Sequence, residues 1–381
     1  MPTDIKSLIR TELEAQFKLW EQPVYRVTQL LEWLYVRRVT SWEAMTNLPK
    51  KLRAQLQENY PLQALELIRK QGARDITQKF LWKLADGAFI ESVLIPANPA
   101  LYGEASDRHT LCVSTQVGCA YGCKFCASGL DGWKRNLTPD EIVEQVLAIE
   151  RWNETESKAG EQKNNAATSG RQPSTPDTRL INNLVIMGMG EPLANYENLL
   201  KALRILNAPW GGGIGARKIT ISTSGLVPQI RRLADEPEQF RLAISMHGAT
   251  DDVRQRLMPV NKKYPLKELT AALEYYQARK DRMITFEYIL IAGVNDALEQ
   301  APPLAALARH LRAKVNLIPY NQVEGLPWER PGEDVCERFL AALEKLKIPA
   351  TLRREKGGDI DAACGQLRLK TEKESRQPAI A

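Results

Sequence analysis

The sequence predicts an α/β protein: a partial (β/α)6 barrel preceded by a small helical domain and a β-hairpin. From about residue 107 onward, short apolar segments alternate with amphipathic helical stretches, which is the pattern of βαβ units with parallel strands. About six such units are present, fewer than a closed eightfold barrel contains. The first 65 or so residues instead place apolar side chains three and four positions apart, which indicates helices.

The N-terminal part divides into two predicted pieces, a helical module over residues 1–75 and a β-hairpin with its connector over residues 76–106. Within the module, Pro49 interrupts the helical pattern and marks a boundary between helices. Two short apolar runs flank Asp86 and Gly87, and an Asp-Gly pair between such runs is a strong hairpin signal.

The barrel is expected over residues 107–352. A helix should begin at Thr138, because Thr138 and Glu141 have the spacing of a capping box. Residues 154–178 contain almost no large apolar side chains, so we expect a disordered surface insertion there. Residues 353–381 are expected to form a C-terminal segment that ends in a loose tail. The predicted barrel strands are residues 110–117, 180–187, 218–222, 241–246, 283–291, 314–318 and 350–353.

Composition indicates which kind of partner and which cellular location to expect. The chain has 381 residues, a net charge of +6 and a pI near 8.9, which suits a polyanionic partner. Among the first 80 residues, 13 are Lys or Arg and 9 are Asp or Glu, so this part carries +4 of the charge. No segment approaches the roughly 18 apolar residues of a membrane helix, and no signal peptide is recognisable. We therefore expect a cytoplasmic protein with no membrane partner, and nothing requires more than a monomer.

The strongest signal for chemistry is a C-x3-C-x2-C segment formed by Cys119, Cys123 and Cys126. Three thiolates at this spacing can ligate three irons of a [4Fe–4S] cluster and leave the fourth iron open. An open iron can bind S-adenosylmethionine and cleave it reductively, and Phe125 is placed to contact the adenine. The alternative is a zinc knuckle, but the second pair of ligands that zinc sites usually show is missing nearby.

Four polar motifs follow successive predicted strands. The carboxyl ends of strands in such a barrel meet at one mouth, so these motifs are expected to converge there. Each motif is weak evidence when taken alone, because a Gly-rich turn is usually only a turn. The motifs are residues 188–192 with Gly190 and Glu191, residues 222–225 with Ser222, residues 245–248 with Ser245, Met246 and His247, and residues 319–321 preceded by Asn316.

Three further cysteines lie outside the cluster motif. Cys112 is on the strand that leads into the cluster loop. Cys364 lies among small and charged residues, which suits an accessible thiol that must reach a substrate. Cys336 lies on an apolar helical face and is interpreted as a small buried hydrophobic residue.

Together these motifs resemble the RlmN/Cfr family of radical S-adenosylmethionine RNA methyltransferases. The resemblance covers nearly the whole chain as far as Gln366, and the block around Cys364 is its most specific part. The chain departs from the usual family pattern at Gly248 and Ala249, where members often have Ala-Pro. The segments that carry the resemblance are TLCVSTQVGCAYGCKFCASG, MGMGEP, STSG, NLIPYN and GGDIDAACGQL.

The resemblance implies a radical-SAM barrel and a two-stage reaction that consumes two S-adenosylmethionine molecules. The first would methylate Cys364, and the second would be cleaved at the single cluster to give a radical that activates this methyl group. The activated carbon would add to an adenine, and Cys112 would then resolve the protein–RNA adduct and leave a Cys112–Cys364 disulfide. Glu91 matches a position assigned as a proton acceptor. The positions implied to contact S-adenosylmethionine are Gly190, Glu191, Ser222, Ser245, Met246, His247 and Asn316.

The implied product is 2-methyladenosine in 23S rRNA and at the adenosine beside a tRNA anticodon, with flavodoxin or ferredoxin as electron donor. Cfr-type methylation at C8 uses the same cysteines and stays open at this point. A radical methylthiotransferase would normally need three more cysteines for a second cluster, which the chain lacks. A cluster-bearing RNA-binding or redox-sensing protein without enzymatic activity would leave Cys364 without a purpose.

Overall fold

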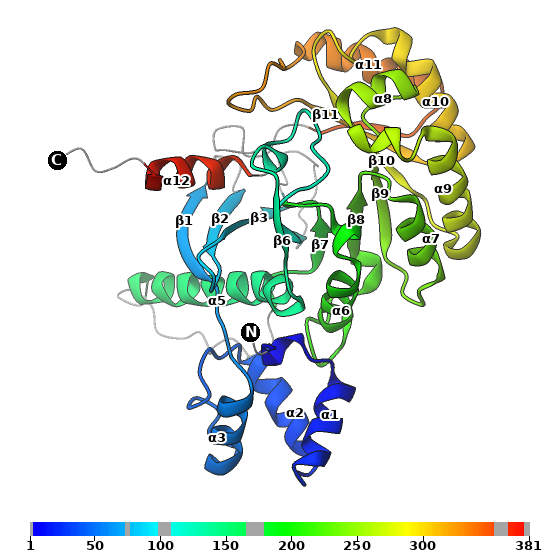
Figure 1. Ribbon diagram of the computed structural model, residues 1–381. Helices are drawn as coiled ribbons and strands as arrows, with labels where there is room; N and C mark the ends of the chain where they lie inside the picture. The colour runs from blue at the N-terminus through cyan, green and yellow to red at the C-terminus, as the bar shows by residue number, and fades with distance from the viewer. Residues whose placement is uncertain (1–2, 73–76, 98–107, 165–178, 354–364, 377–381) are drawn as a thin grey trace, which may run out of the picture.

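The computed structural model describes residues 3–72, 77–97, 108–164, 179–353 and 365–376 (Figure 1). Within these residues one sheet of ten strands runs through the molecule in the order β1-β2-β3-β4-β7-β8-β9-β10-β11-β12. The pairs from β1 to β4 are antiparallel, whereas all pairs from β4 to β12 are parallel. The hairpin and the barrel are therefore one continuous sheet.

A helical module lies at one end of the molecule (Figure 1). Leu13 and Phe17 of the first helix and Val27 of the second are buried, which is the apolar face that the helical spacing predicted. Pro49 is the N-cap of the third helix and confirms the predicted boundary. The helices are α1 (Arg10–Leu19), α2 (Tyr25–Leu31), which continues as a π-helical turn (Glu32–Val36), and α3 (Lys50–Asn59).

Three antiparallel strands precede the barrel: β1 (Glu66–Gly72), β2 (Gln78–Lys83) and β3 (Phe89–Pro96). The predicted hairpin is confirmed, and Gly87 adopts φ = 84° in its turn, a conformation that favours glycine. β1 was not expected, because the sequence analysis assigned this stretch to the helical module. It is an edge strand with mainly exposed side chains, so it lacks a clear apolar alternation.

The parallel part confirms the partial barrel and each predicted strand. Residues 110–117 form two strands rather than one, because the chain leaves the main sheet after β4 to enter the cluster loop. The strands are β4 (His109–Cys112), β7 (Asn183–Ile186), β8 (Ile219–Thr223), β9 (Arg241–Ser245), β10 (Thr285–Leu290), β11 (Lys314–Pro319) and β12 (Ala350–Leu352). The helices are α5 (Pro139–Asn164), α6 (Tyr196–Asn207), α7 (Val227–Asp235), α8 (Asp251–Leu257), α9 (Leu266–Lys280), α10 (Ala301–His310) and α11 (Glu333–Lys345).

Short elements complete the barrel. A second sheet consists of β5 (Gln116–Gly118) and β6 (Trp133–Asn136), which pair antiparallel on either side of the cluster loop. The 3-10 helices are Ile5–Ser7, Ala127–Gly129, Pro192–Asn195, Ala216–Lys218, Pro259–Lys262 and Leu298–Gln300. Among the described helices, none combines the length and apolar character required to span a bilayer.

Two boundaries predicted from the sequence are wrong. The insertion does not begin at residue 154, because α5 continues to Asn164 through Glu, Lys, Ala and Gln residues, which favour helix even when exposed. The remainder of the insertion, residues 165–178, lies outside the described residues. Part of the expected loose tail is also helical, since α12 spans Gln366–Arg376. Ion pairs of this helix, such as Arg69–Glu374, join it to the rest of the chain.

Candidate functional site

The three clustered cysteines lie on the loop between β5 and β6. The loop is closed at its base, where the Cys119 N–H donates to the Gly132 carbonyl at 3.1 Å. Gly118 has φ = 75°, and a Cβ there would lie 1.9 Å from the Gly132 carbonyl oxygen, so this closure requires glycine. Within the loop, the Cys126 N–H donates to the Cys123 carbonyl at 3.2 Å. The local fold thus brings the three cysteines to one side of the barrel mouth.

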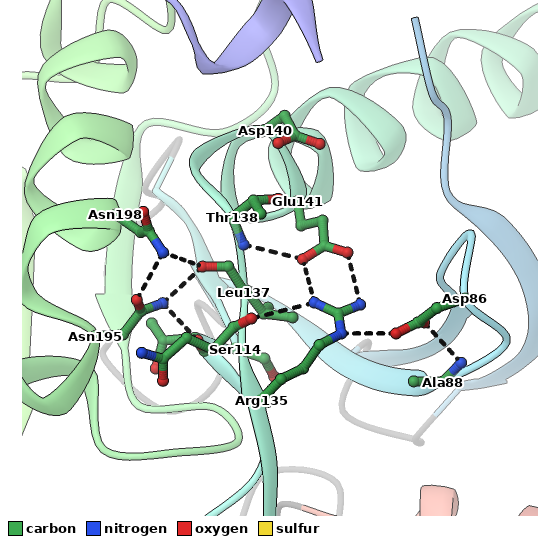
Figure 2. Close-up of polar contacts among 12 residues, drawn as sticks. Asp86, Ala88, Ser114, Arg135, Leu137, Thr138, Asp140, Glu141, Asn195 and Asn198 are labelled. Carbon is green, nitrogen blue, oxygen red and sulfur yellow. Dashed lines mark hydrogen bonds and ion pairs between the residues drawn. The ribbon is translucent and has the colours of Figure 1, made fainter. Parts of the chain in front are cut away.

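Arg135 of β6 ties the base of the loop to two neighbouring elements (Figure 2). Its guanidinium forms a bidentate pair with Glu141 at 2.7 and 2.8 Å and also donates to Asp86 in the hairpin turn at 2.6 Å. Glu141 in turn accepts from the Thr138 N–H at 3.0 Å, which confirms that half of the predicted capping box. Asn195 donates to the Leu137 carbonyl from the opposite side at 2.7 Å. The cluster loop therefore leaves from a rigid, polar base.

Burial and the neighbouring thiols both disfavour the charged form of the cluster cysteines. Burial raises the pKa of Cys119 to about 12, with a further increase from Cys126. Burial also raises the pKa of Cys123 well above its usual range, and Cys126 and Cys119 add to the effect. Among the described residues, no group of three or more His, Cys, Asp or Glu side chains has a geometry that could hold a metal ion. Iron coordination would stabilise the thiolates that burial disfavours.

The glycines of the 188–192 motif allow close packing within the chain. A Cβ on Gly190, where φ is 100°, would lie 2.5 Å from Gln116 Cβ, and one on Gly188 would lie 2.7 Å from the Ser114 nitrogen. Glu191 is buried and accepts from the N–H of Leu193 at 3.0 Å and of Ser224 at 2.7 Å. Its carboxylate thus joins the loops that follow β7 and β8, and burial raises its pKa.

Polar side chains form a row across three neighbouring strands near the barrel mouth. Ser245 is paired with Glu287 between β9 and β10, and Glu287 is paired with Asn316 between β10 and β11. The Asn316 amide donates to the Glu287 carboxylate at 3.0 Å and accepts from the Thr351 hydroxyl at 2.8 Å. Ser222 lies on β8 and is buried. The predicted ligand-contact residues Ser222, Ser245 and Asn316 are thus on β8, β9 and β11, and Glu287 on β10 lies between Ser245 and Asn316 although the sequence motifs did not reveal it.

His247 and Met246 follow β9 directly. The His247 ring lies 4.8 Å from the Phe125 ring in an edge-on contact, and its Nδ1 accepts from the Ile289 N–H at 3.0 Å. Burial lowers the pKa of His247 to about 3, with a further decrease from Arg254, so the imidazole is neutral at neutral pH. The side chain of Met246 is buried in the core, so contact with a ligand at this position would come from its backbone.

His247→Asn is expected to make the free energy of unfolding less sensitive to acid. The pKa of the folded state is below the usual value of 6.5, so the unfolded chain binds this proton first and stability falls as pH drops from 6.5 toward 3. At pH 4.5 the loss is about 3 kcal/mol relative to pH 7. Asn tolerates the left-handed backbone at this position, where φ is 52°, and does not titrate. Urea unfolding of the cluster-free protein at both pH values should show a smaller loss in the variant, and equal losses would contradict the assignment.

Glu91 on β3 anchors the N-terminus of α12. One carboxylate oxygen accepts from the Gly365 N–H at 2.8 Å, and the other accepts from the Arg368 N–H at 2.7 Å. Lys79 of β2 lies 2.9 Å from the same carboxylate, and both side chains are buried. A carboxylate at unpaired N–H groups of a helix N-terminus is a favourable arrangement. In this structure Glu91 therefore acts as a helix anchor.

The same helix also contacts the cluster loop. The Arg368 guanidinium pairs with Asp131 at 3.1 Å, and an added Cβ on Gly365 would lie 3.0 Å from the Ser128 nitrogen. Cys112 is paired with Val93 on β3, two residues beyond the anchor Glu91. Cys364 and its predicted disulfide lie outside the described residues. The residue that follows Cys364 is nevertheless fixed beside the turn after the last cluster cysteine.

Glu91→Ala is expected to destabilise the protein by about 3 kcal/mol, because it breaks a buried ion pair and removes two helix-end contacts. The loss should concentrate at α12 and appear as faster hydrogen exchange at the amides of Gly365 and Arg368. Glu66→Ala is the matched control, since Glu66 forms an exposed pair with Lys83 at 3.2 Å in the same sheet and should contribute under about 1 kcal/mol. Equal effects of the two substitutions would show that Glu91 is not an anchor.

The comparisons with known proteins cover the chain from end to end. Residues 3–61 match the ribosomal RNA large subunit methyltransferase N-terminal domain, and residues 179–301 match the radical SAM superfamily. A protein of Opitutus terrae, named "Probable dual-specificity RNA methyltransferase RlmN 3", is 51% identical over 97% of this chain and 95% of its own length. A protein of Akkermansia muciniphila, named "Probable dual-specificity RNA methyltransferase RlmN", is also 51% identical, over 92% of this chain and 91% of its own.

A solved structure gives the same result for the fold. The crystal structure of a radical SAM methyltransferase from Sphaerobacter thermophilus is 43% identical and superposes with a TM-score of 0.83, covering 96% of this chain and 99% of that one. The two relatives that carry the RlmN name align with 97% and 92% of this chain. The chain therefore belongs to the radical SAM superfamily and, within it, to the RlmN family.

Proposed function

We propose that this protein methylates C2 of an adenosine in 23S rRNA and of the adenosine beside a tRNA anticodon, with Cys364 as the carrier of the methyl group. The relatives' printed names describe dual-specificity RNA methyltransferases, and this supports the RlmN-type activity over Cfr-type methylation at C8 and over a non-enzymatic role. The observation that carries the proposal is the position of α12, whose first residues contact both Glu91 and the turn after Cys126.

This position suits a carrier thiol. Gly365 is held by the buried Glu91 carboxylate, so the residue before it starts from a fixed point. Ser128 belongs to the turn that follows Cys126, and Gly365 packs against its backbone. Gly365 therefore lies between the cluster loop and the hairpin strand β3. Cys112, on the strand beside β3, is on the same side as Glu91 and suits the proposed resolving role.

The proposed cofactors are one [4Fe–4S] cluster, held by Cys119, Cys123 and Cys126, and S-adenosylmethionine. When bound, they supply one-electron cleavage of a carbon–sulfur bond, which the protein's own side chains cannot perform. The protein itself would position these cofactors and exclude water from them. Ser222, Ser245 and Asn316 offer polar groups on β8, β9 and β11, and the neutral His247 ring packs against Phe125.

In this proposal Glu191 and Glu91 are positioning residues. Glu191 is not a direct contact of S-adenosylmethionine, and Glu91 is not a proton acceptor in the resting enzyme. Both carboxylates already accept two backbone N–H groups, so they position the loops and the helix that surround the ligand. Proton acceptance by Glu91 would require that one of these contacts open during the reaction. We therefore propose that Glu91 holds α12 in the resting enzyme.

RNA binding is proposed for the helical module together with the barrel mouth. The exposed Lys and Arg side chains of the helical module suit phosphate contacts. The Arg26 guanidinium lies over the ring of the exposed Tyr25, 4.8 Å from the ring centroid. The target adenine would have to leave its stack to reach the mouth. The electron donor is proposed to be a small reducing protein such as flavodoxin or ferredoxin, and the enzyme is proposed to act as a cytoplasmic monomer.

The experiment is anaerobic turnover with a reconstituted cluster, S-adenosylmethionine, a reductant and unmodified ribosomal RNA or tRNA, followed by nucleoside separation against standards. A peak of 2-methyladenosine with each RNA would support the full proposal. A peak of 8-methyladenosine would replace it with Cfr-type activity. Formation of 5′-deoxyadenosine without either nucleoside would show that the chemistry is present and the RNA substrate is wrong.

A further inference from the structure

Arg254 on α8 is a cation enclosed within the barrel. The residue has no exposed surface. Its Nη1 donates to Asn261 Oδ1 at 2.8 Å, and its Nη2 donates to the Ser224 carbonyl at 2.5 Å. Its Nε has no hydrogen-bond partner among the described residues. The side chain is therefore held in place by two neutral acceptors while one donor stays unused.

The structure gives this cation no ionic partner within the described chain. Asp251 lies at the start of the same helix. Asp251 is already occupied, because its carboxylate accepts from the Asn261 amide and from the Leu266 N–H, both at 2.9 Å. A buried guanidinium that lacks a counter-ion is costly, so an anion is expected to complete this site. The cluster loop indicates the side from which that anion comes, because the N–H of Lys124, next to Cys123, donates at 2.9 Å to the carbonyl of Leu257 at the end of the same helix.

Two glycines at the barrel mouth pack closely against Arg254, one against its side chain and one against its backbone. A Cβ on Gly225, where φ is 107°, would lie 3.1 Å from Arg254 Nη2. A Cβ on Gly248 would lie 2.4 Å from the Arg254 backbone nitrogen. These glycines end the motifs after β8 and β9, so both strand ends are shaped around Arg254. The packing at these two strand ends therefore fixes the position of the Arg254 charge.

We propose that Arg254 is the fixed positive charge that pairs with the iron–sulfur cluster bound by Cys119, Cys123 and Cys126 and raises its reduction potential. The inference rests on the proposed assignment of the cluster to these cysteines. A cluster with three thiolate ligands is anionic, and one-electron reduction adds a further negative charge. A nearby buried cation stabilises the reduced form more than the oxidised form. Arg254 is a positioning residue, since it acts through the cluster.

The test compares the midpoint potential of the cluster in the wild-type protein, Arg254→Gln and Arg254→Lys, without S-adenosylmethionine. Loss of the charge in Arg254→Gln is expected to lower the equilibrium constant for one-electron reduction about tenfold, a shift of about 59 mV to more negative potential. Arg254→Lys keeps the charge and should show less than about half of that shift. Arg38→Gln is the control for loss of a buried arginine far from the cluster, because Arg38 pairs with Glu154 and Glu150 near α5.

Each result decides the proposal. An unchanged potential in Arg254→Gln overturns it, and if S-adenosylmethionine then binds more weakly, the completing anion is the carboxylate of that ligand. Failure of Arg254→Gln to assemble a cluster that Arg254→Lys assembles supports the need for charge, whereas failure of both variants counts against it. A wild-type protein that assembles no cluster would contradict the proposed function itself.

Discussion

Cys364→Ala is expected to reduce RNA methylation by more than about a thousandfold, because the carrier sulfur is removed and no other side chain can take its place. The cluster and the fold should persist, since Gly365, Arg368 and Glu91 make contacts that fix α12. The measurement is the yield of 2-methyladenosine, together with the absorbance of the cluster.

The matched control is Cys112→Ala, which keeps the proposed carrier and removes the proposed resolving thiol. This variant should accumulate a slow-migrating protein–RNA species that ribonuclease removes, whereas Cys364→Ala should not. Normal methylation by Cys364→Ala would contradict the carrier role. Free, normally methylated RNA from Cys112→Ala would contradict the resolving role and leave the carrier role intact.

Cys126→Ser is expected to abolish formation of 5′-deoxyadenosine and to remove most of the cluster absorbance, because only two thiolate ligands remain. Cys126 lies where the cluster loop turns back toward β6, and its N–H contacts the Cys123 carbonyl. A serine preserves that backbone contact, so the protein should still fold. Iron content and the thermal unfolding midpoint, measured on one preparation, separate loss of the cluster from loss of the fold.

Cys336→Ser is the control for this prediction. Cys336 is buried on α11 in the hydrophobic core, as expected from its apolar helical face. Its replacement should lower the unfolding midpoint while the iron content per folded protein stays unchanged. Equal loss of iron in both variants would show that the cluster is not specific to the loop cysteines.

Much of the barrel could be predicted, because its strands are short apolar runs separated by amphipathic helices. The missed strand β1 and the helical continuation of α5 have a common cause. Both are rich in polar residues, so their structure depends on strand pairing or on helix propensity and not on an apolar pattern.

The sequence predicted only those parts of the candidate site whose residues belong to short motifs. The cluster cysteines and the ends of the strands are recognisable because their residues are near one another in the sequence. Arg254 and Glu287 were missed, since each is an ordinary charged residue in a helix or strand until folding buries it. Lys79 and Arg368 are far apart in the sequence, and both were recognisable only once Glu91 was seen between the hairpin and α12.

The central claim is that the methyl group passes through Cys364. The most direct measurement is peptide mass spectrometry of the protein after anaerobic incubation with S-adenosylmethionine carrying an isotopically labelled methyl group. The account predicts a labelled methyl group on the peptide that contains Cys364, and its disappearance when RNA and reductant are added. A label on another cysteine, or labelled RNA without any labelled Cys364 peptide at early times, would contradict it.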